Sequence, residues 1–314
     1  MPAEQDPARD PATAAAAAED VVVVEEDPST GDLFADPEDY YPPTPPPKQE
    51  SYTLRSGERV TLHLVGSSPL EAHHLWNGSR VLADYFEADP AGTVRGRTVL
   101  ELGAGAGLPS LVAAVLGARK VVVTDFPDPE LVATMWKNVD GVEDLVLAGQ
   151  KQKQQQQQQQ GTGGGDGDRR QTALVADGHV WGADPAPLLA HLDDDDDDGL
   201  SPAPLPVRKF DVLILADLLF RHSEHGNMLR SVRTTMRRRA ESAAYVFFTS
   251  YRPWLREKDL RFFELAREQG FLVDQVLERR MDRPLFENDP GDEEVLKTVT
   301  GWRLRWPEGE WDES

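Results

Sequence analysis

Three alternating glycines mark the stretch of the chain that is best suited to chemistry. Residues 99–109 read Val-Leu-Glu-Leu-Gly-Ala-Gly-Ala-Gly-Leu-Pro, with glycines at Gly103, Gly105 and Gly107. The apolar residues before them suit a buried strand, and the small residues after them suit a helix over about 109–116. Glycine lets a backbone approach a ligand closely, and the first N–H groups of a helix lack partners within the helix. The stretch therefore predicts a site for a polar ligand where a strand meets a helix.

The spacing of these glycines favours S-adenosylmethionine (SAM) over a dinucleotide. The dinucleotide fingerprint is G-x-G-x-x-G, and here the third glycine comes one residue early. Glu101 is unfavourable beside a pyrophosphate, whereas it suits SAM, which carries an ammonium and a sulfonium. Asp125 ends a second predicted strand roughly 20 residues after Gly103, where an acceptor for ribose hydroxyls is expected. We predict SAM as the cofactor, with a nicotinamide dinucleotide or a turn without a ligand as the alternatives.

Further candidate side chains follow other predicted strand ends. Asp217 and Phe220 follow an apolar strand, where an acid can accept a hydrogen bond from a substrate amine and a ring can wall it. Trp181 is expected on or beside the adenine, with a core position as the alternative. Trp76 lies off the core face of its predicted helix, so it either closes the cofactor pocket or packs on the sheet. Residues 251–254 line a substrate mouth or form an ordinary aromatic loop.

The order of elements indicates how these residues come together. Hydrophobic periodicity predicts a hairpin over 52–64, strands near 98–102, 120–124, 173–176, 210–216, 244–249, 271–277 and 298–306, and helices near 74–86, 109–116, 128–138, 223–239 and 257–269. Alternating strands and helices predict a mostly parallel sheet with helices on both faces, and two closing strands without a helix between them suggest one antiparallel strand. Ligands of such sheets bind at the carboxyl ends of the strands, so one cleft should gather the candidates.

Charged side chains outside this cleft have simpler interpretations. Arg237 to Arg239 are expected in the last turn of a helix, where cations suit the helix dipole. His222 and His225 have the spacing of a metal pair, but no third ligand is evident and a solvated helix face is simpler. We therefore predict no metal site. Residues 284–294 are expected to form an acidic loop.

Composition excludes several classes of protein. The 314 residues suffice for one α/β domain with appendages, and the absence of cysteine removes disulfides, thiolate zinc sites and cysteine nucleophiles. No apolar run approaches the ~20 residues of a membrane helix, and the N-terminus lacks the basic region of a secretory signal. A net charge of −22 disfavours nucleic acid as a partner and can steer the chain toward a basic protein. A cytoplasmic location without membrane contact is expected.

Composition also divides the chain. Residues 1–50 are acidic and proline-rich and are expected to be a disordered tail. The aromatic residues of segment 33–47 suggest docking on the domain or on a partner, with a plain linker as the alternative. Residues 51–314 are the predicted domain, with low-complexity insertions near 149–171 and 193–206.

The motifs resemble those of a known family. An acid-x-x-aromatic box after the fourth strand, here Asp217-Leu218-Leu219-Phe220, is typical of the Rossmann-like, seven-strand class I SAM-dependent methyltransferases. Within that superfamily the chain is similar to the fungal-type enzymes that methylate the N-terminal glycine and the adjacent lysine of translation elongation factor 1-alpha, a group once labelled nicotinamide N-methyltransferase-like. The matching stretches include 33–34, 37–39, 42–47, 74–77, 99–109, 124–129, 181–182, 216–220, 222, 224–225, 252–253, 257–260 and 262–264.

This resemblance implies a function and a set of site residues. The family's cofactor contacts fall on Trp76, Gly103, Ala104, Gly105, Asp125, Trp181 and Ala216, and the substrate end on Asp217 and Phe220. The chain is then expected to be a monomeric enzyme that uses SAM to methylate elongation factor 1-alpha. A small-molecule N-methyltransferase and a SAM-binding partner protein without turnover remain as alternatives.

Overall fold

The computed structural model describes residues 43, 45–149, 173–192, 208–286 and 289–312. The described residues from 45 onward form one compact unit. The predicted insertions, apart from Gly149, and the tail up to residue 42 lie outside the described residues. Of the predicted docking segment 33–47, residues 43 and 45–47 are described. The backbone of Pro45 and Pro46 passes so close to Gly66 that a Cβ there would lie 1.8 Å from the carbonyl oxygen of Pro45.

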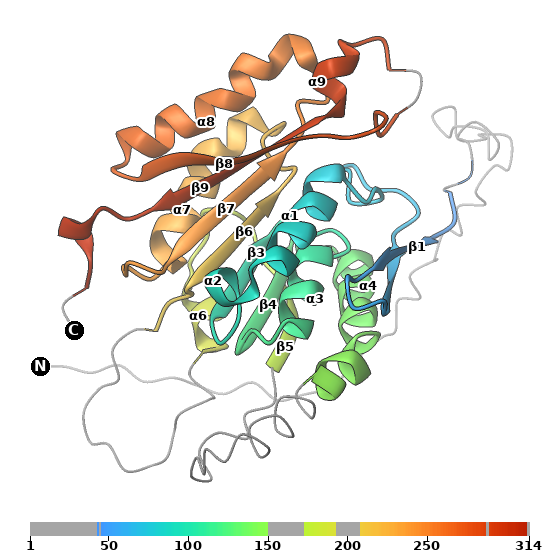
Figure 1. Cartoon of the computed structure of the whole chain (residues 1–314), viewed down its shortest axis with the longest axis horizontal. Helices are drawn as coiled ribbons and strands as arrows, with labels where there is room; N and C mark the ends of the chain where they lie inside the picture. The colour runs from blue at the N-terminus through green and yellow to red at the C-terminus, as the bar shows by residue number, and fades with distance from the viewer. Residues whose placement is uncertain (1–42, 44, 150–172, 193–207, 287–288, 313–314) are drawn as a thin grey trace, which may run out of the picture. The chain divides into compact units, whose positions relative to one another are not determined.

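A hairpin and a seven-stranded sheet make up the strands of the described part (Figure 1). The hairpin pairs β1 (Lys48–Thr53) with β2 (Arg59–Leu64), so regular structure begins three residues before the predicted domain boundary at 51. The large sheet contains β3 (Thr98–Leu102), β4 (Lys120–Asp125), β5 (Ala173–Gly178), β6 (Val212–Ala216), β7 (Ala243–Phe248), β8 (Leu272–Arg280) and β9 (Thr298–Arg305).

The order of strands across the sheet is β5-β4-β3-β6-β7-β9-β8. Neighbours from β5 to β7 are parallel, and β9 runs antiparallel to both β7 and β8. This confirms the prediction of a mostly parallel sheet with one antiparallel strand. The chain reverses its direction of travel across the sheet between β3 and β6, and ligands of open α/β sheets bind at such a switch point.

Helices cover both faces of the sheet, as predicted (Figure 1). One face carries α1 (Asn77–Ala88), α2 (Pro90–Thr93), α3 (Leu108–Val115) and α4 (Pro129–Asp140). The other face carries α6 (Ala186–Ala190), α7 (His225–Thr235) and α8 (Arg256–Glu268). The short helix α9 (Glu293–Lys297) begins in the last two residues of the predicted loop 284–294 and leads into β9. It forms because Asp292 caps its first turn and Lys297 bonds back to Glu293.

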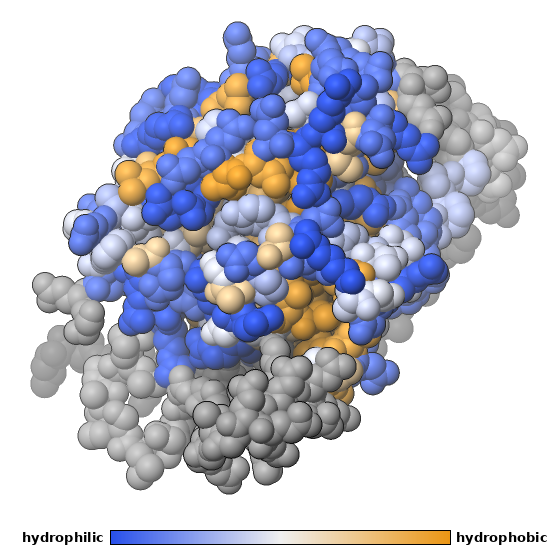
Figure 2. Space-filling view, viewed as in Figure 1, coloured by the Kyte–Doolittle hydropathy of each residue, from blue (hydrophilic) through white to orange (hydrophobic). Residues whose placement is uncertain are grey.

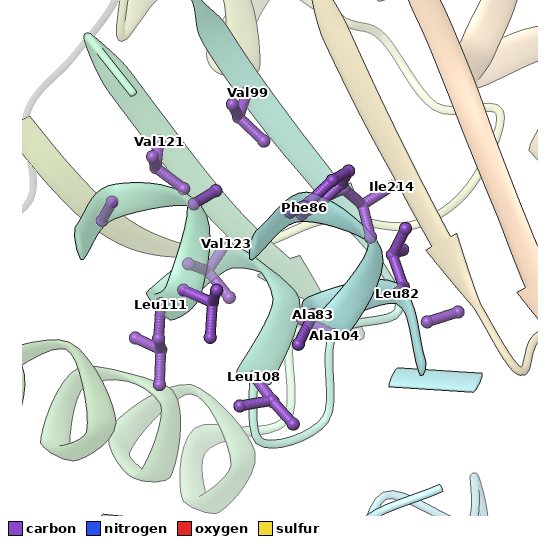
Figure 3. Packing of buried hydrophobic residues seen from close by; sticks show 14 of the residues in the cluster. Leu82, Ala83, Phe86, Val99, Ala104, Leu108, Leu111, Val121, Val123 and Ile214 are labelled. Atoms are coloured by element: carbon purple, nitrogen blue, oxygen red, sulfur yellow. The ribbon is translucent and has the colours of Figure 1, made fainter. Parts of the chain in front are cut away.

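The core consists of two apolar layers on either side of the sheet. Side chains alternate along each strand, so that Val99 contributes to one layer and Leu100 to the other. Figure 3 shows the first layer, in which Phe86 of α1 lies beside Ile214 of β6. Phe86 is fully buried, as are most strand residues. These packed layers fix the strand ends from which the site is built.

The sequence prediction for the end of α7 is wrong. The helix ends at Thr235, and Met236 takes an extended conformation with ψ 130° and pairs as a bridge with Phe210. Arg237 then reaches back to Asp211, with 3.1 Å between Nη1 and Oδ1. Arg237 to Arg239 therefore lie beyond the helix, because an ion pair and a strand-like bridge replace its last turn.

Hydrophilic side chains cover most of the face shown in Figure 2, in keeping with the net charge of −22. Hydrophobic side chains gather over β8 and beside α3. Among the described residues, no helix is both long and apolar enough to span a membrane.

Candidate active site

The glycine turn after β3 needs glycine at three alternating positions because of its backbone conformation. Gly103, Gly105 and Gly107 have φ values of 64°, 54° and 75°, in the left-handed region that favours glycine. A Cβ at Gly103 would lie 2.6 Å from Cδ2 of Leu218 and 2.9 Å from Cζ2 of Trp181. The turn is held from the next strand, because the N–H of Gly105 donates to Oδ2 of Asp125 at 2.7 Å.

This turn forms the floor of a cavity of about 260 Å³, called here the smaller cavity. Nine of the ten site residues predicted from the sequence line it, namely Trp76, Gly103, Ala104, Gly105, Asp125, Trp181, Ala216, Asp217 and Phe220. They come from the ends of β3, β4, β5 and β6 and from the start of α1. The prediction that one cleft gathers the strand ends is confirmed for Gly103, Asp125, Trp181 and Asp217, whereas Tyr251 lines a different cavity.

Glu101 is the exception. Its side chain is 1% exposed and does not line the cavity. Its carboxylate accepts a hydrogen bond from the N–H of Ser110 at 3.2 Å, near the start of α3, and burial raises its pKa to about 8. Glu101 is therefore not in the cavity wall, where its direct contact with a cationic ligand was expected. It instead holds α3 against the glycine turn.

Asp125 lies where a ribose acceptor is expected. Its oxygens accept backbone hydrogen bonds from Gly105 and from Phe126, and burial raises its pKa while these two bonds act in the opposite direction. A carboxylate has about four lone-pair sites. Asp125 can therefore hold the turn and still accept hydrogen bonds from a pair of hydroxyls.

His179 belongs to the same cavity and was missed by the sequence analysis. It follows β5, and its Nε2 is buried with no hydrogen-bond partner in the described part of the chain. Burial lowers its pKa, so the neutral ring prevails near pH 7. A neutral imidazole can donate to a ligand or accept from it. Its position at a strand end, two residues before Trp181, is the sequence feature that could have identified it as a site residue.

A second cavity of about 720 Å³, the larger cavity, adjoins the first. The two share Glu71, Trp76, Asp217, Phe220 and Arg221 in their walls. The larger cavity is otherwise lined by residues that follow β6 and β7 and by the start of α8. A ligand in one cavity therefore meets a ligand in the other at Asp217.

Asp217 is held in an unusual state at this junction. Its φ of 55° is a left-handed conformation that few residues other than glycine adopt. Oδ1 accepts a hydrogen bond from the N–H of Thr249 at 3.0 Å. Oδ2 is buried and makes no hydrogen bond of ordinary geometry among the described residues, although it lies near the backbone N–H groups at the start of α1. Burial raises the pKa of Asp217 to about 7, and the backbone N–H groups of Thr249, Gly78 and Ser79 offset part of this rise. Strain and an unsatisfied buried oxygen together mark a functional group.

Gly78, at the start of α1, makes room for this carboxylate. A Cβ at Gly78 would lie 2.3 Å from Oδ2 of Asp217. The positive end of the helix dipole, at the first turn of α1, therefore lies against Asp217 and favours its charged form.

Aromatic rings wall the larger cavity. Trp76 packs against Tyr251 and Phe286, with ring centroids 4.8 Å and 5.8 Å away. Nε1 of Trp76 donates to the carbonyl oxygen of Glu71 at 3.1 Å, which fixes the indole between the cavities. Of the predicted mouth residues, Tyr251 and Arg252 line the larger cavity, whereas Trp254 is 66% exposed and does not.

The two histidines after β6 do not share a solvated face. His225 is 2% exposed, and its Nε2 bonds to the carbonyl oxygen of Leu219 at 2.8 Å. The expectation of a solvated face is thus wrong for His225, because the chain folds η1 (His222–Glu224) back onto α8. Elsewhere, Glu71, His73 and His74 bring one potential ligand atom each within 4.8 Å. A Glu71–His73 contact at 3.9 Å also suits a simple ion pair.

The fold is Rossmann-like, with a cavity at the switch point of the sheet. A family model described as lysine methyltransferase matches residues 66–158. The protein N-terminal and lysine N-methyltransferase EFM7 of Gibberella zeae is 55% identical over 276 residues, which are 88% of this chain and 94% of that protein. The Neurospora crassa protein of the same name is 54% identical over 277 residues, 88% of each chain. This chain belongs to the family of protein N-terminal and lysine N-methyltransferases.

More distant relatives extend the comparison. The Schizosaccharomyces pombe efm7 protein is 36% identical over 279 residues, 88% of this chain and 95% of that protein. Among solved structures, the Thermus thermophilus 16S rRNA methyltransferase RsmC in complex with AdoMet and guanosine is 17% identical with a TM-score of 0.42, covering 85% of this chain and 52% of that chain. That likeness is weak, and the family assignment rests on the fungal proteins.

Proposed function

We propose that this enzyme transfers methyl groups from SAM to the N-terminal glycine of translation elongation factor 1-alpha and to the lysine beside it. The observation that carries the proposal is the unpartnered Oδ2 of Asp217 at the junction of two cavities. The names of the fungal relatives, which specify protein N-termini and lysine, support the choice of acceptor. The motifs that resemble the elongation-factor methyltransferases support the choice of protein.

The smaller cavity suits SAM. Its floor of glycines admits the ligand to the backbone, Asp125 can accept from the ribose hydroxyls, and Nε2 of His179 has bonding capacity to spare. When bound, SAM supplies an electrophilic methyl group. Trp76, Trp181 and Phe220 enclose this cavity and exclude water from the donor.

Asp217 orients the acceptor amine. Its buried oxygen can take a hydrogen bond from an N–H of the amine, which directs the nitrogen lone pair toward the donor. The lone pair forms the N–C bond as the C–S bond breaks and its electron pair stays on sulfur. Orientation of this kind supplies much of the acceleration of such a displacement. The backbone at the ends of β6 and β7, which packing holds in place, provides this orientation.

The acceptor must be neutral when it attacks. A protein α-amino group has a pKa of about 7.7–8.0 and a lysine about 10.4. An α-amine thus needs little assistance at neutral pH, whereas a lysine needs a group that removes its proton. The chain offers an ionisable side chain, that of Asp217, where the two cavities meet, and a broad acceptor cavity of about 720 Å³.

We also propose that the enzyme acts as a monomer in the cytoplasm, without nucleic acid or membrane as a partner. Its net charge of −22 would attract a basic protein substrate. Sedimentation of the pure protein and fractionation of cells test these two points separately.

A labelling assay tests the function. Purified protein is incubated with methyl-labelled SAM and either elongation factor 1-alpha or nicotinamide. We expect label in the elongation factor only. Label in nicotinamide alone would identify a small-molecule enzyme, and binding of SAM without transfer to either acceptor would indicate a partner protein without turnover.

A further inference from the structure

A histidine–aspartate pair in the wall of the larger cavity has no role in the steps described so far. Nε2 of His222 lies 2.7 Å from Oδ1 of Asp259, in the first turn of α8. The Asp259 side chain is 7% exposed and that of His222 is 25% exposed. Both residues line the larger cavity, and neither lines the smaller one. The pair therefore faces the acceptor and not the methyl donor.

The environment fixes how this imidazole is oriented. Asp259 is an acceptor that favours a proton on Nε2 of His222, so the lone pair of the neutral ring lies on Nδ1. The His225 ring packs edge-on against it at 5.7 Å, and His225 is itself fixed by the carbonyl oxygen of Leu219. Within the described residues, Nδ1 of His222 has no hydrogen-bond partner. The pair thus presents a free basic nitrogen on a ring that is held from two sides.

The reaction needs such a group. Each methyl added to an ammonium requires the loss of one proton from nitrogen, and a lysine retains its proton at neutral pH. Asp217 is enclosed at the junction, and its bond to Thr249 serves to fix it in place. A proton acceptor nearer the open side of the cavity would leave Asp217 free to orient the amine.

We propose that His222, positioned by Asp259, accepts the proton that the substrate amine loses before methyl transfer. This inference rests on the proposed function. The N–H bond breaks with its electron pair remaining on the amine nitrogen, and the proton passes to Nδ1 of His222 directly or through one water. The imidazolium, paired with Asp259, then releases the proton to solvent in the larger cavity.

Other charged groups around His222 share this cavity or pack against the ring. They come from α7 and α8, from the loops after β6 and β7, and from the loop before α1, and they are Glu71, Asp217, Arg221, His225, Arg252 and Asp259. Asp259 is the carboxylate in direct contact with the ring.

The test compares His222→Gln with the wild type on two peptides. One carries a free N-terminus and no lysine, and the other has an acetylated N-terminus and one lysine. Methylation rates are followed from about pH 6 to about pH 10, which brackets the pKa values of the two amines. His63→Gln, in β2 and outside both cavities, is the matched control.

We expect His222→Gln to lower kcat at pH 7 by about 100-fold on the lysine peptide, because general base catalysis contributes at least that factor. On the α-amine peptide the loss should be no more than about tenfold, because roughly a tenth of that amine is already neutral at pH 7. The loss should shrink as pH rises past the α-amine pKa of about 8 on the first peptide and persist to about pH 10 on the lysine peptide. His63→Gln should match the wild type throughout. SAM affinity by calorimetry should be unchanged in all three proteins.

A second measurement addresses Asp259 without relying on turnover. Nitrogen-15 spectra of histidine-labelled protein, with the signals of His222 assigned from the His222→Gln variant, should show the Nε2–H form, and Asp259→Asn should abolish that preference. An equal loss of rate at every pH on both peptides, an unchanged rate, or an Nδ1–H form in the wild type would overturn the inference. If the wild type methylates neither peptide nor elongation factor 1-alpha, the proposed function itself fails.

Discussion

At the scale of the residue, the site depends on one acid kept in an unfavourable state. Asp217 combines a left-handed backbone, complete burial of Oδ2 and a pKa of about 7. Each of these costs folding free energy. The surrounding strands β6 and β7 maintain the arrangement because their residues are fully buried. Such a concentration of strain at one carboxylate is expected where a substrate completes the hydrogen bonds.

Asp217→Asn should therefore separate stability from activity. An acid whose pKa is raised on folding contributes most to stability below its unfolded pKa of about 3.9, and that contribution is lost as pH rises to the folded pKa of about 7. The free energy of unfolding of the variant, minus that of the wild type, should therefore increase by about 1–3 kcal/mol from pH 5 to pH 7.5. Urea unfolding at both pH values measures this gain. A pH-independent difference would contradict the account.

His179→Ala should weaken SAM binding without a change in fold. The buried Nε2 of His179 has bonding capacity that a ligand in the smaller cavity can use, and a lost hydrogen bond of this kind costs about 1 kcal/mol, or roughly fivefold in Kd. Calorimetric titration with SAM measures the change. His63→Ala serves as the control, and equal affinities for the two variants would remove His179 from the cofactor site.

At the scale of the element, the glycine turn between β3 and α3 decides whether the cofactor fits. Gly103→Ala adds a methyl group that overlaps Leu218 and Trp181, besides the strain of a positive φ. Gly96→Ala is the matched control, because Gly96 has φ +73° and a Cβ added there would have nothing within 4 Å. Both variants should lose about 1 kcal/mol of stability from strain. Only Gly103→Ala should lose SAM binding in calorimetry, and retention of binding would contradict the placement of the cofactor.

Periodicity and apolar runs were sufficient for the long strands and helices, whereas the short helices α2 and α9 were not predicted. Asp128 begins the helix that was predicted near 128–138, and its side chain caps α4 by accepting from the N–H of Leu131 at 3.0 Å. The end of α7 could not be predicted from the sequence, since it depends on a bridge between Met236 and Phe210 and an ion pair between Arg237 and Asp211. Likewise, Glu101 stands in the expected motif, but which way its carboxylate turns depends on the N–H of Ser110.

Contacts between distant elements explain what the sequence could not provide for the site. The pairing of His222 with Asp259 joins residues 37 positions apart, and neither spacing nor residue type points to it. The junction at Asp217 similarly requires Gly78 of α1 and Thr249 after β7. Candidates at strand ends were predictable because parallel strands bring their carboxyl ends to one edge of the sheet. The residues that contact and orient these candidates are set only by packing, so the sequence did not show them.

At the scale of the whole molecule, the sheet order places the smaller cavity at the switch point between β3 and β6, and the larger cavity adjoins it at the ends of β6 and β7. The net charge of −22 then acts over the entire surface. If it steers a basic protein substrate, KM for elongation factor 1-alpha should rise several-fold between about 50 mM and about 300 mM salt, since screening shortens the Debye length. The kcat should change little. A KM that is independent of salt would exclude long-range steering.

The central claim is that Asp217, between a donor cavity and an acceptor cavity, directs methyl transfer to a protein amine. Peptide-resolved mass spectrometry of elongation factor 1-alpha, after incubation with SAM and either the wild type or Asp217→Asn, tests it most directly. The account predicts methyl groups on the N-terminal glycine and on the neighbouring lysine with the wild type, and none with the variant although it still binds SAM. Methylation at those two positions by Asp217→Asn at the wild-type rate would contradict it.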